Sequence, residues 1–310
     1  MQLTQRDEQL LHLLYEHRFL RTDQLLALSY AFAEPYTEQT LWRRLRKLSE
    51  HSYVEKLAQR QQGRTVYCLG KQGAKHVAAS RGLPLKQIAY SSNSGIRFLA
   101  HKLGIADVRT ALTVACLRSH NRQCDQPRLD QRIEWVSELE LSNQAVQVQT
   151  PHGESLPLNP DGFVIFPDPR GNPSQCFVEV DLGTEPLGVF KDKVVAYQHY
   201  RSGFPQCRSA LSSTVLTVAH SAERMESLLV ATEDVGGDEQ FAFTTCDELT
   251  PETFFDGIWR VAGLRTRTTE EVGERTTVRR HRPVAVPVVT PSSPFLTPRP
   301  VPLSLSNLSL

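Results

Sequence analysis

The sequence predicts an α+β protein in which a small unit of helices and one β-hairpin precedes a larger mixed α/β domain. Residues 1–90 contain leucines at helical spacing and two strand-like runs joined by a turn. Residues 95–265 alternate short apolar runs with helix-like stretches. Residues 266–310 hold seven of the 19 prolines and little periodicity, which is typical of a disordered tail rich in Pro, Ser and Thr. We therefore expect two folded domains and that tail, in keeping with a length of 310 residues.

The composition is that of an ordinary globular chain and excludes several classes of protein. With 40% hydrophobic and 22% charged residues, the chain is not a collagen, a coiled-coil rod or a wholly disordered protein. No run approaches the roughly 18 apolar residues of a membrane span, and the opening MQLTQRDEQL is too polar for a signal peptide. The six cysteines are scattered without a CxxC pair, which favours free thiols over a zinc site or disulfides. We expect a cytoplasmic protein with no membrane partner.

Charge is distributed unevenly, although the total of 35 Lys+Arg against 34 Asp+Glu is nearly balanced. Residues 1–90 have 14 Lys+Arg and 8 Asp+Glu, a net of +6. Residues 91–265 have 15 and 23, a net of −8, and residues 266–310 have 6 and 3, a net of +3. A basic surface suits phosphate backbones and clustered carboxylates suit hard cations, so the two halves predict different partners.

Three helices are predicted at the N-terminus. Thr4 and Asp7 form a capping box ahead of a helix that ends near Glu16. Thr22 begins a short second helix, and Thr37 caps a third helix that contains the buried leucine stripe.

A β-hairpin follows the third helix. Alternating runs at 53–57 and 65–69 flank a polar turn that contains Gly63, and a helix over 71–81 closes the unit. Three helices followed by a hairpin in this order predict a winged helix, whose third helix lies in the major groove of DNA. The hairpin tip, from Gln62 to Arg64, would reach the DNA backbone or the minor groove.

The third helix offers a candidate DNA-reading face. Opposite its leucine stripe, the helix and the hairpin tip present side chains that donate to bases and phosphates, namely Gln39, Arg43, Arg44, Lys47 and Arg64. Such residues can also be the solvated side of an amphipathic helix, and a winged helix can dock onto proteins. We favour contact with double-stranded DNA because helix order, hairpin and net charge agree.

The second domain is predicted to begin, after a linker at 91–95, with a long helix over 95–119, broken near Gly104. The helix contains His101, which we expect to be a core residue, and Asp107. Strand-like runs and helices then alternate along the chain: runs at 133–141, 163–166, 176–181, 215–218 and 241–244, and helices around 191–200, 225–230 and 252–261. The runs at 163–166 and 176–181 are expected to pair as a hairpin.

Carboxylates gather on that hairpin. Asp161 opens one strand, while Glu179 and Asp181 occupy alternate positions of its neighbour and so share a face. Carboxylates held together repel each other unless a cation is present, and Mg²⁺ binds oxygen ligands through one or two carboxylates. The sequence therefore predicts a Mg²⁺ or Mn²⁺ site formed by Asp161, Glu179 and Asp181, with a neighbouring lysine to neutralise developing charge.

The pattern resembles the restriction-endonuclease-like superfamily, whose signature is PD…(D/E)xK. Pro160-Asp161 matches its first part and Glu179-Val180-Asp181 its second, except that Asp181 stands where the lysine is expected. In that superfamily the lysine sometimes lies on the next helix, which nominates Lys193 first and Lys191 second. The resemblance implies a nuclease-like α/β domain, and the departure bears on catalysis more than on fold.

A longer series of motifs, from Leu3 to Gly263, resembles the replication-relaxation family of plasmids and other mobile elements. The series comprises the winged helix, His101 and Asp107, Trp135-x-x-Glu138, Pro160-Asp161-Gly162, Glu179-x-Asp181-x-Gly183-Thr184-Glu185, Lys193 and Tyr197. That family is similar to conjugative relaxases related to restriction endonucleases. The resemblance implies binding to a plasmid origin alongside replication or mobilisation proteins. It further implies metal-dependent nicking by Asp161, Glu179 and an upstream glutamate, Glu138 or Glu134.

Structural roles for the same residues stand beside this interpretation. Asp161 between Pro and Gly is a common turn residue, Glu185 can favour a helix N-terminus, and Lys193 can be a solvated helix charge. Tyr197 is expected to serve in packing and not as a nucleophile. The sequence therefore leaves open whether the chain is a Mg²⁺-dependent endonuclease or a non-catalytic regulator of replication or transcription with a degenerate nuclease-like domain.

Overall fold

The computed structural model describes most of the chain. The described residues are 1–32, 34–61, 63–90, 98–123, 133–142, 146–200, 213–267 and 279–285. The predicted linker at 91–95, the hairpin-tip residue Gln62 and most of 266–310 lie outside them.

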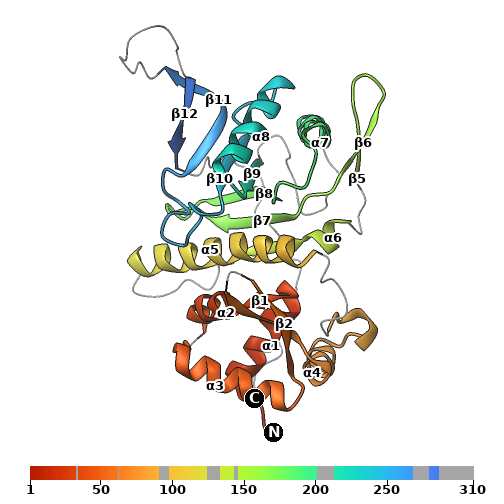
Figure 1. Cartoon of the computed structure of the whole chain (residues 1–310), viewed down its shortest axis with the longest axis vertical. Coiled ribbons are helices and arrows are strands. Elements are labelled where there is room, and N and C mark those ends of the chain that lie inside the picture. Colours follow the sequence, from red (N-terminus) through yellow and green to blue (C-terminus); the bar gives the residue numbers. More distant parts are fainter. Residues whose placement is uncertain are drawn as a thin grey trace.

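The N-terminal region has its helices and hairpin in the order that the sequence predicts (Figure 1). Its elements are α1 (Gln5–His17), β1 (Leu20–Arg21), α2 (Thr22–Leu28), the 3₁₀ helix η1 (Ser29–Ala31), α3 (Glu38–Glu50), β2 (Val54–Gln61), β3 (Arg64–Leu69), α4 (Lys71–Arg81) and the 3₁₀ helix η2 (Leu85–Gln87). The strands form an antiparallel sheet in the order β1-β3-β2.

Helix caps set the starts of these helices. The Thr4 side chain accepts a hydrogen bond from the Asp7 backbone N–H, and the Asp7 carboxylate accepts one from the Thr4 N–H, which completes the predicted capping box. Thr37 caps α3 through the backbone N–H of Thr40. In α2 the N-cap is Arg21, one residue earlier than the Thr22 cap that the sequence suggests, because Gln24 accepts from the Arg21 N–H at 2.8 Å.

The second region is built on a seven-stranded sheet with helices on both faces (Figure 1). The strand order is β12-β11-β10-β9-β8-β7-β4, with β8, β9 and β10 parallel and the outer pairs antiparallel. The elements are α5 (Leu99–Gln123), β4 (Glu134–Ser137), α6 (Glu138–Ser142), β5 (Val146–Gln149), β6 (Ser155–Leu158), β7 (Gly162–Pro167), β8 (Pro173–Asp181), α7 (Leu187–His199), β9 (Thr214–Ala219), α8 (Ala222–Asp234), β10 (Phe241–Thr245), β11 (Trp259–Arg267) and β12 (Arg279–Val284). A separate hairpin, β5–β6, projects from the sheet. Mixed helices and strands confirm the predicted α+β class.

Alternate side chains of β8 enter two different cores. Phe177 packs in the core under α7 and α8, whereas Val178 and Val180 pack in the core under α5. This alternation fixes which polar residues of β8 face which helix, since residues two apart share a face. Glu179 and Asp181 therefore lie on the side of α7 and α8.

Helix α5 lies between the N-terminal region and the sheet (Figure 1). Val108 and Leu112 pack on the sheet, whereas Leu99 and Leu103 pack with Phe19 and other buried side chains of the N-terminal region. A helix that is apolar on several faces is typically buried on both sides. The predicted break near Gly104 is absent. A Cβ at Gly104 would lie 2.8 Å from Val180 Cγ1, so the glycine permits close packing inside an unbroken helix.

A polar cluster adds to the apolar contact between α5 and the N-terminal region. The Arg21 guanidinium donates to both oxygens of Asp107 at 3.0 and 2.5 Å. The Gln24 amide donates to the same carboxylate at 2.8 Å and to the Leu103 carbonyl at 3.2 Å. Arg21 and Gln24 are buried, so these bonds tie α2 to α5 in a region shielded from water.

Besides the break near Gly104, three sequence predictions are wrong, two of them for the second region and one for the tail. The run at 133–141 ends as a strand at Ser137 and continues as α6, because Glu140 accepts from the Ser137 N–H and hydroxyl, as a helix N-cap partner does. Residues 251–258 form turns rather than a helix, and Trp259 begins β11. The Trp259 indole donates to the Phe254 carbonyl at 2.9 Å, which closes a compact turn. The aromatic residues of this turn are spaced as in a helix although the backbone is not helical.

The third correction concerns the tail. Residues 279–284 were expected to be disordered, yet they form β12, which pairs antiparallel with β11 at the edge of the sheet. The Arg-rich composition gives no strand signal, and the segment becomes a strand by pairing with β11, the strand that precedes it in the chain.

Candidate functional site

Helix α3 presents an exposed polar stripe. Gln39, Arg43 and Lys47 are spaced four residues apart and all are exposed, as is Arg64 at the start of β3. Residues at this spacing lie on one face of a helix. Within the described part of the chain, neither Arg43, Lys47 nor Arg64 forms an ion pair, so their charges are available to a partner.

Arg44 has a different role from its neighbours. Its guanidinium donates to both carboxylate oxygens of Asp7, a fully buried residue in the first turn of α1. Burial alone would raise the pKa of Asp7, but the hydrogen bonds from Arg44 and Thr4 lower it. Arg44 therefore connects α3 to α1. The sequence analysis predicted that Arg44 contacts DNA, but its guanidinium is already bound to Asp7.

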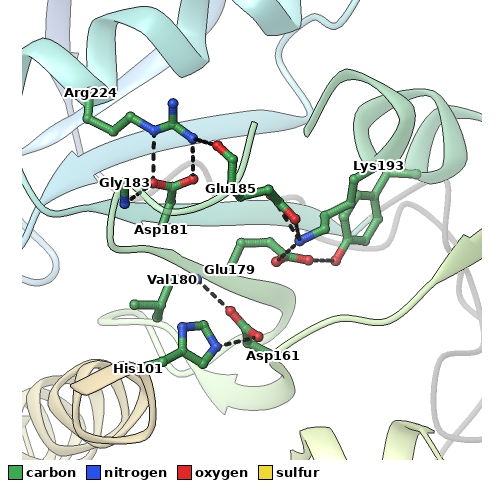
Figure 2. A network of polar contacts seen from close by, with 10 residues as sticks. His101, Asp161, Glu179, Val180, Asp181, Gly183, Glu185, Lys193 and Arg224 are labelled. Carbon is green, nitrogen blue, oxygen red and sulfur yellow. Dashed lines mark hydrogen bonds and ion pairs between the residues drawn. The ribbon is translucent and has the colours of Figure 1, made fainter. Parts of the chain in front are cut away.

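Asp161 lies just before β7 and is held by two elements (Figure 2). Its backbone N–H donates to the Val178 carbonyl at 3.1 Å, and one carboxylate oxygen accepts from the Val180 N–H at 2.7 Å. The other oxygen lies 2.9 Å from Nε2 of His101 on α5. That hydrogen bond raises the pKa of His101, although burial acts the other way. Asp161 is thus a fixed, almost buried carboxylate rather than a solvated turn residue.

Glu179 on β8 is buried and meets two side chains of α7. The Lys193 ammonium lies 3.0 Å from one carboxylate oxygen, and the Tyr197 hydroxyl donates to the other at 2.5 Å. Lys193 also pairs with Glu185 at 3.4 Å (Figure 2). Lys193 is four residues before Tyr197, so both side chains project from one face of the helix toward β8.

The electrostatics link Glu179 to Asp161. Burial raises the pKa of Glu179 to about 7 against the opposing charge of Lys193, and the Asp161 carboxylate raises it as well. Burial would lower the pKa of Lys193, but the carboxylates of Glu179, Glu185 and Asp161 raise it above its usual value. Lys193 therefore remains an ammonium ion at neutral pH. Burial also raises the pKa of Tyr197, which keeps its hydroxyl protonated as a donor.

Asp181 shares a strand face with Glu179 but has other partners. Its carboxylate accepts from the Arg224 guanidinium of α8 at 2.9 and 2.8 Å, and from the Gly183 N–H at 2.6 Å. The predicted trio of Asp161, Glu179 and Asp181 is therefore not gathered at one point. Among the described residues, no group of three or more His, Cys, Asp and Glu side chains is arranged to hold a metal ion.

The remaining predicted residues lie at the margin of this site. Glu138 is the first residue of α6 and is partly exposed, and it pairs with Lys102 at 3.2 Å. Its charge contributes to the raised pKa of His101, after the larger effect of Asp161. Glu134 is exposed on the edge strand β4, and Lys191 faces away and pairs with Asp234 at 3.0 Å. Lys193, not Lys191, is thus the lysine beside Glu179.

Sequence reasoning missed three contributors to the site. His101 was assigned to the core, Tyr197 to packing, and Arg224 was not considered. Tyr197 does pack, since its ring lies 5.2 Å from that of Phe177, but its hydroxyl also meets Glu179. The available signal for Lys193 and Tyr197 was their spacing of four on a helix after Glu179; no local pattern points to Arg224.

Comparison with known families supplies an identity for this arrangement. The profile of the replication-relaxation family matches residues 11–215, more than half of the 310 residues. The chain belongs to the replication-relaxation family. Neither the curated proteins nor the solved structures contain a significant match to it.

This replication-relaxation protein is related by its family to the replication of plasmids and other mobile elements. The match covers the whole N-terminal region after the start of α1, and extends through Asp161, Glu179 and Lys193. No helix within the described ranges combines the length and the apolar character that crossing a membrane requires. Among the described residues, Cys68, Cys116, Cys176 and Cys246 form no disulfide.

Proposed function

We propose that this chain binds double-stranded DNA of a plasmid origin through its N-terminal region and nicks it in a metal-dependent reaction at Asp161, Glu179 and Lys193. The contact that carries the proposal is the 3.0 Å pair between Lys193 and Glu179. It brings a lysine from α7 to the second acidic residue of the PD…ExD pattern, beside Asp161. The lysine that the signature lacks on the strand is thereby supplied by the following helix.

DNA binding is supported by the charge and order of the N-terminal elements. The exposed stripe of Gln39, Arg43 and Lys47 lies on the third helix, and Arg64 lies at the hairpin that follows. In a winged helix these two elements contact the major groove and the adjacent backbone. The proposed DNA-binding set therefore comprises these four residues, without Arg44.

The donor set of the acidic site fits Mg²⁺ or Mn²⁺. Mg²⁺ commonly binds through one or two carboxylates, and the Asp161 carboxylate lies close enough to Glu179 to raise the pKa of Glu179. Asp161 and Glu179 would hold the ion, and Asp181 would not, because Arg224 and Gly183 occupy it. A bound ion would supply positive charge that stabilises a phosphoryl group under attack.

The chain's own groups have distinct roles in this proposal. Lys193 stays protonated and offers a fixed positive charge to a phosphate in the site. Tyr197 holds one oxygen of Glu179, and His101 together with the Val180 N–H fixes the orientation of Asp161. Catalysis gains from such preorganised charges because they need no rearrangement during the reaction.

One observation favours a second candidate function, a non-catalytic regulator of replication or transcription. Both oxygens of Asp161 and both oxygens of Glu179 already interact with groups of the protein. A site satisfied in this way can be a structural remnant of a nuclease.

Metal binding and nicking are tested separately. In thermal melting, Mg²⁺ or Mn²⁺ should raise the Tm of the wild-type chain by linkage, and Asp161→Asn should remove the rise. In a nicking assay, the substrate is a supercoiled plasmid that carries the origin of the replicon from which the protein comes. Cleavage should require a divalent ion, and Asp161→Asn or Glu179→Gln should abolish it.

Lys193→Ala should reduce nicking, with Lys191→Ala as the matched control, since Lys191 lies on the same helix but faces Asp234. A metal-dependent Tm without nicking would establish the regulator in place of the nuclease. If the protein shows neither a metal-dependent Tm nor nicking, the acidic cluster is structural.

A further inference from the structure

A second stripe on α3 lies beside the proposed DNA-reading stripe, on the side of the hairpin, and the two meet at Arg43. Trp42, Arg46 and Ser49 follow at intervals of four and three residues, and Trp42 is 42% exposed. Opposite them lie Lys56 on β2 and Tyr67 on β3, which are direct partners in the hairpin register. Together with Arg43 these side chains line a groove of about 600 Å³ between α3 and the hairpin.

The groove combines an aromatic surface with a cationic rim. Arg43, Arg46 and Lys56 are exposed at its edge, and Tyr67 is buried at its base. None of the described residues that line it is acidic. Arg46 forms an exposed pair with Glu50 at 3.6 Å, an interaction that is weak in water.

The indole ring of Trp42 is exposed and has no aromatic or arginine partner among the described residues. Within the described part of the chain its ring stacks on no other aromatic ring and lies under no arginine, unlike Tyr15, Phe19, Tyr36 and Trp135. A large exposed aromatic side chain beside cations is a feature of surfaces that bind single-stranded nucleic acid, because bases stack on the ring while cations bind phosphates.

We infer that this groove binds an unpaired nucleobase, stacked on Trp42, with the flanking phosphates held by Arg43, Arg46 and Lys56. The inference deepens the proposed DNA binding and rests on it. A base inside a duplex has both faces covered by its neighbours, so only an unpaired or extruded base offers a free face to the indole. The volume is within the 300–1,000 Å³, roughly, of sites that enclose small ligands, and it admits one nucleotide.

The experiment uses the full chain and three fluorescently labelled 20-base-pair probes that share one sequence. The first is a blunt duplex, the second has one unpaired thymine at its centre, and the third has an abasic residue in place of that thymine. Wild type should bind the thymine-bulge probe at least five-fold more tightly than either of the others. Trp42→Ala should remove this preference, a loss in the range of roughly 5- to 150-fold that stacking of one base supplies.

Two variants control for fold and for general aromatic contacts. Trp42→Phe retains a stacking ring and should keep most of the preference. Tyr30→Ala removes an aromatic side chain that is 60% exposed elsewhere in the same region, and should leave all three affinities unchanged. Circular dichroism melting should give nearly the same Tm for Trp42→Ala as for wild type, because Trp42 is 42% exposed and belongs to none of the buried core clusters.

The outcomes separate this inference from the proposed function. Binding to the blunt duplex with no preference for the bulge, or an abasic probe bound as tightly as the thymine probe, would overturn the base pocket and leave duplex binding intact. The pocket is equally lost if Trp42→Ala keeps the full preference. Absence of binding to all three probes at low salt would overturn DNA binding itself and the pocket with it.

Discussion

Arg43 and Arg44 are adjacent on α3 but have different roles. Arg43 is exposed, whereas Arg44 is bound to the buried carboxylate of Asp7. A helix rotates by about 100° per residue, so adjacent side chains meet different surroundings. A sequence pattern of consecutive cations predicts the amphipathic helix, but it does not say which cation a distant carboxylate will bind.

Substitution of the two arginines should have different effects on the free energy of unfolding. Arg44→Ala leaves Asp7 buried without its partner, and breaking such a pair is expected to lower the free energy of unfolding by about 3 kcal/mol. Arg43→Ala should change that free energy by less than about 0.5 kcal/mol, as exposed substitutions commonly do. Urea unfolding of both variants measures the difference. Equal effects would contradict the assignment of Arg44 to the α1–α3 contact.

Glu179 should make stability depend on pH. Its pKa is raised to about 7 in the folded chain from an ordinary 4.5, so the folded state binds a proton that the unfolded state releases. The stabilisation is complete below about pH 4.5 and is lost as pH rises through about 7, a change on the order of 1–3 kcal/mol.

Glu179→Gln cannot titrate and should flatten the fall in stability between pH 4.5 and 7, whatever its absolute stability. Chemical unfolding at a series of pH values gives this slope. His101, whose raised pKa acts in the same direction, contributes a residual slope at higher pH. A variant slope equal to that of wild type would show that Glu179 is ionised throughout the range.

The site was predictable where its signal is local. The position of Glu179 on its strand and a lysine on the next helix were enough to nominate Glu179 and Lys193, which meet at 3.0 Å, whereas Asp181, nominated by the same alternation, binds Arg224 instead. The partners of those residues were not predictable, because His101 and Asp161 are 60 positions apart and Asp181 and Arg224 are 43 apart. Such contacts depend on how α5 and α8 pack on the sheet.

At the level of secondary structure, elements with their own end signals were predicted best. Thr4 and Thr37 fix the starts of α1 and α3, and the turn at Gly63, whose φ is +71°, separates β2 from β3. Residues 252–261 were mistaken for a helix because Phe254, Phe255 and Ile258 repeat at helical spacing. The spacing of apolar side chains indicates which residues are buried but not the backbone conformation that buries them. Here a compact turn followed by a strand buries Phe254 and Ile258.

The exposed stripe of α3 should dominate the salt dependence of DNA binding. Arg43→Ala combined with Lys47→Ala is expected to weaken duplex binding by roughly 1–3 kcal/mol and to reduce the slope of log affinity against log salt by about 1–2. Fluorescence anisotropy of the full chain between 50 and 200 mM salt, roughly the range over which phosphate contacts weaken most visibly, gives both values.

The matched control for that double variant is Lys71→Ala with Lys75→Ala on α4, which removes the same charge from another helix of the N-terminal region. The control should change the slope less than the α3 variant does. Equal losses from both pairs would indicate a diffuse electrostatic attraction and would remove α3 from its reading role.

Across the whole molecule, α5 is the element shared by the two regions. Asp107 meets Arg21 and Gln24 of the N-terminal region, and His101, six residues earlier on the same helix, meets Asp161. The buried polar cluster and the apolar side chains around it join the regions over one continuous helix. We expect the two regions to unfold together.

Asp107→Ala should weaken that connection. It removes two hydrogen bonds from the buried Arg21 guanidinium and one from Gln24, which is expected to cost about 2 kcal/mol. Calorimetry should show one transition for wild type and a lower, broader or divided transition for the variant. Asp23→Ala is the control, because Asp23 also pairs with Arg21 but belongs to α2 and does not reach α5. A sharp single transition for Asp107→Ala at the wild-type Tm would contradict the connection.

The pairing of β12 with β11 has a consequence for solubility. An unpaired strand edge offers backbone donors and acceptors to other chains, and natural proteins protect such edges with charge and proline. The sequence of β12, RRHRPV, combines three arginines with Pro283 at the outermost position of the sheet. A chain cut after β11 would leave the backbone of β11 open to pairing with a second copy, so β12 is expected to limit association of the protein by covering this edge of the sheet.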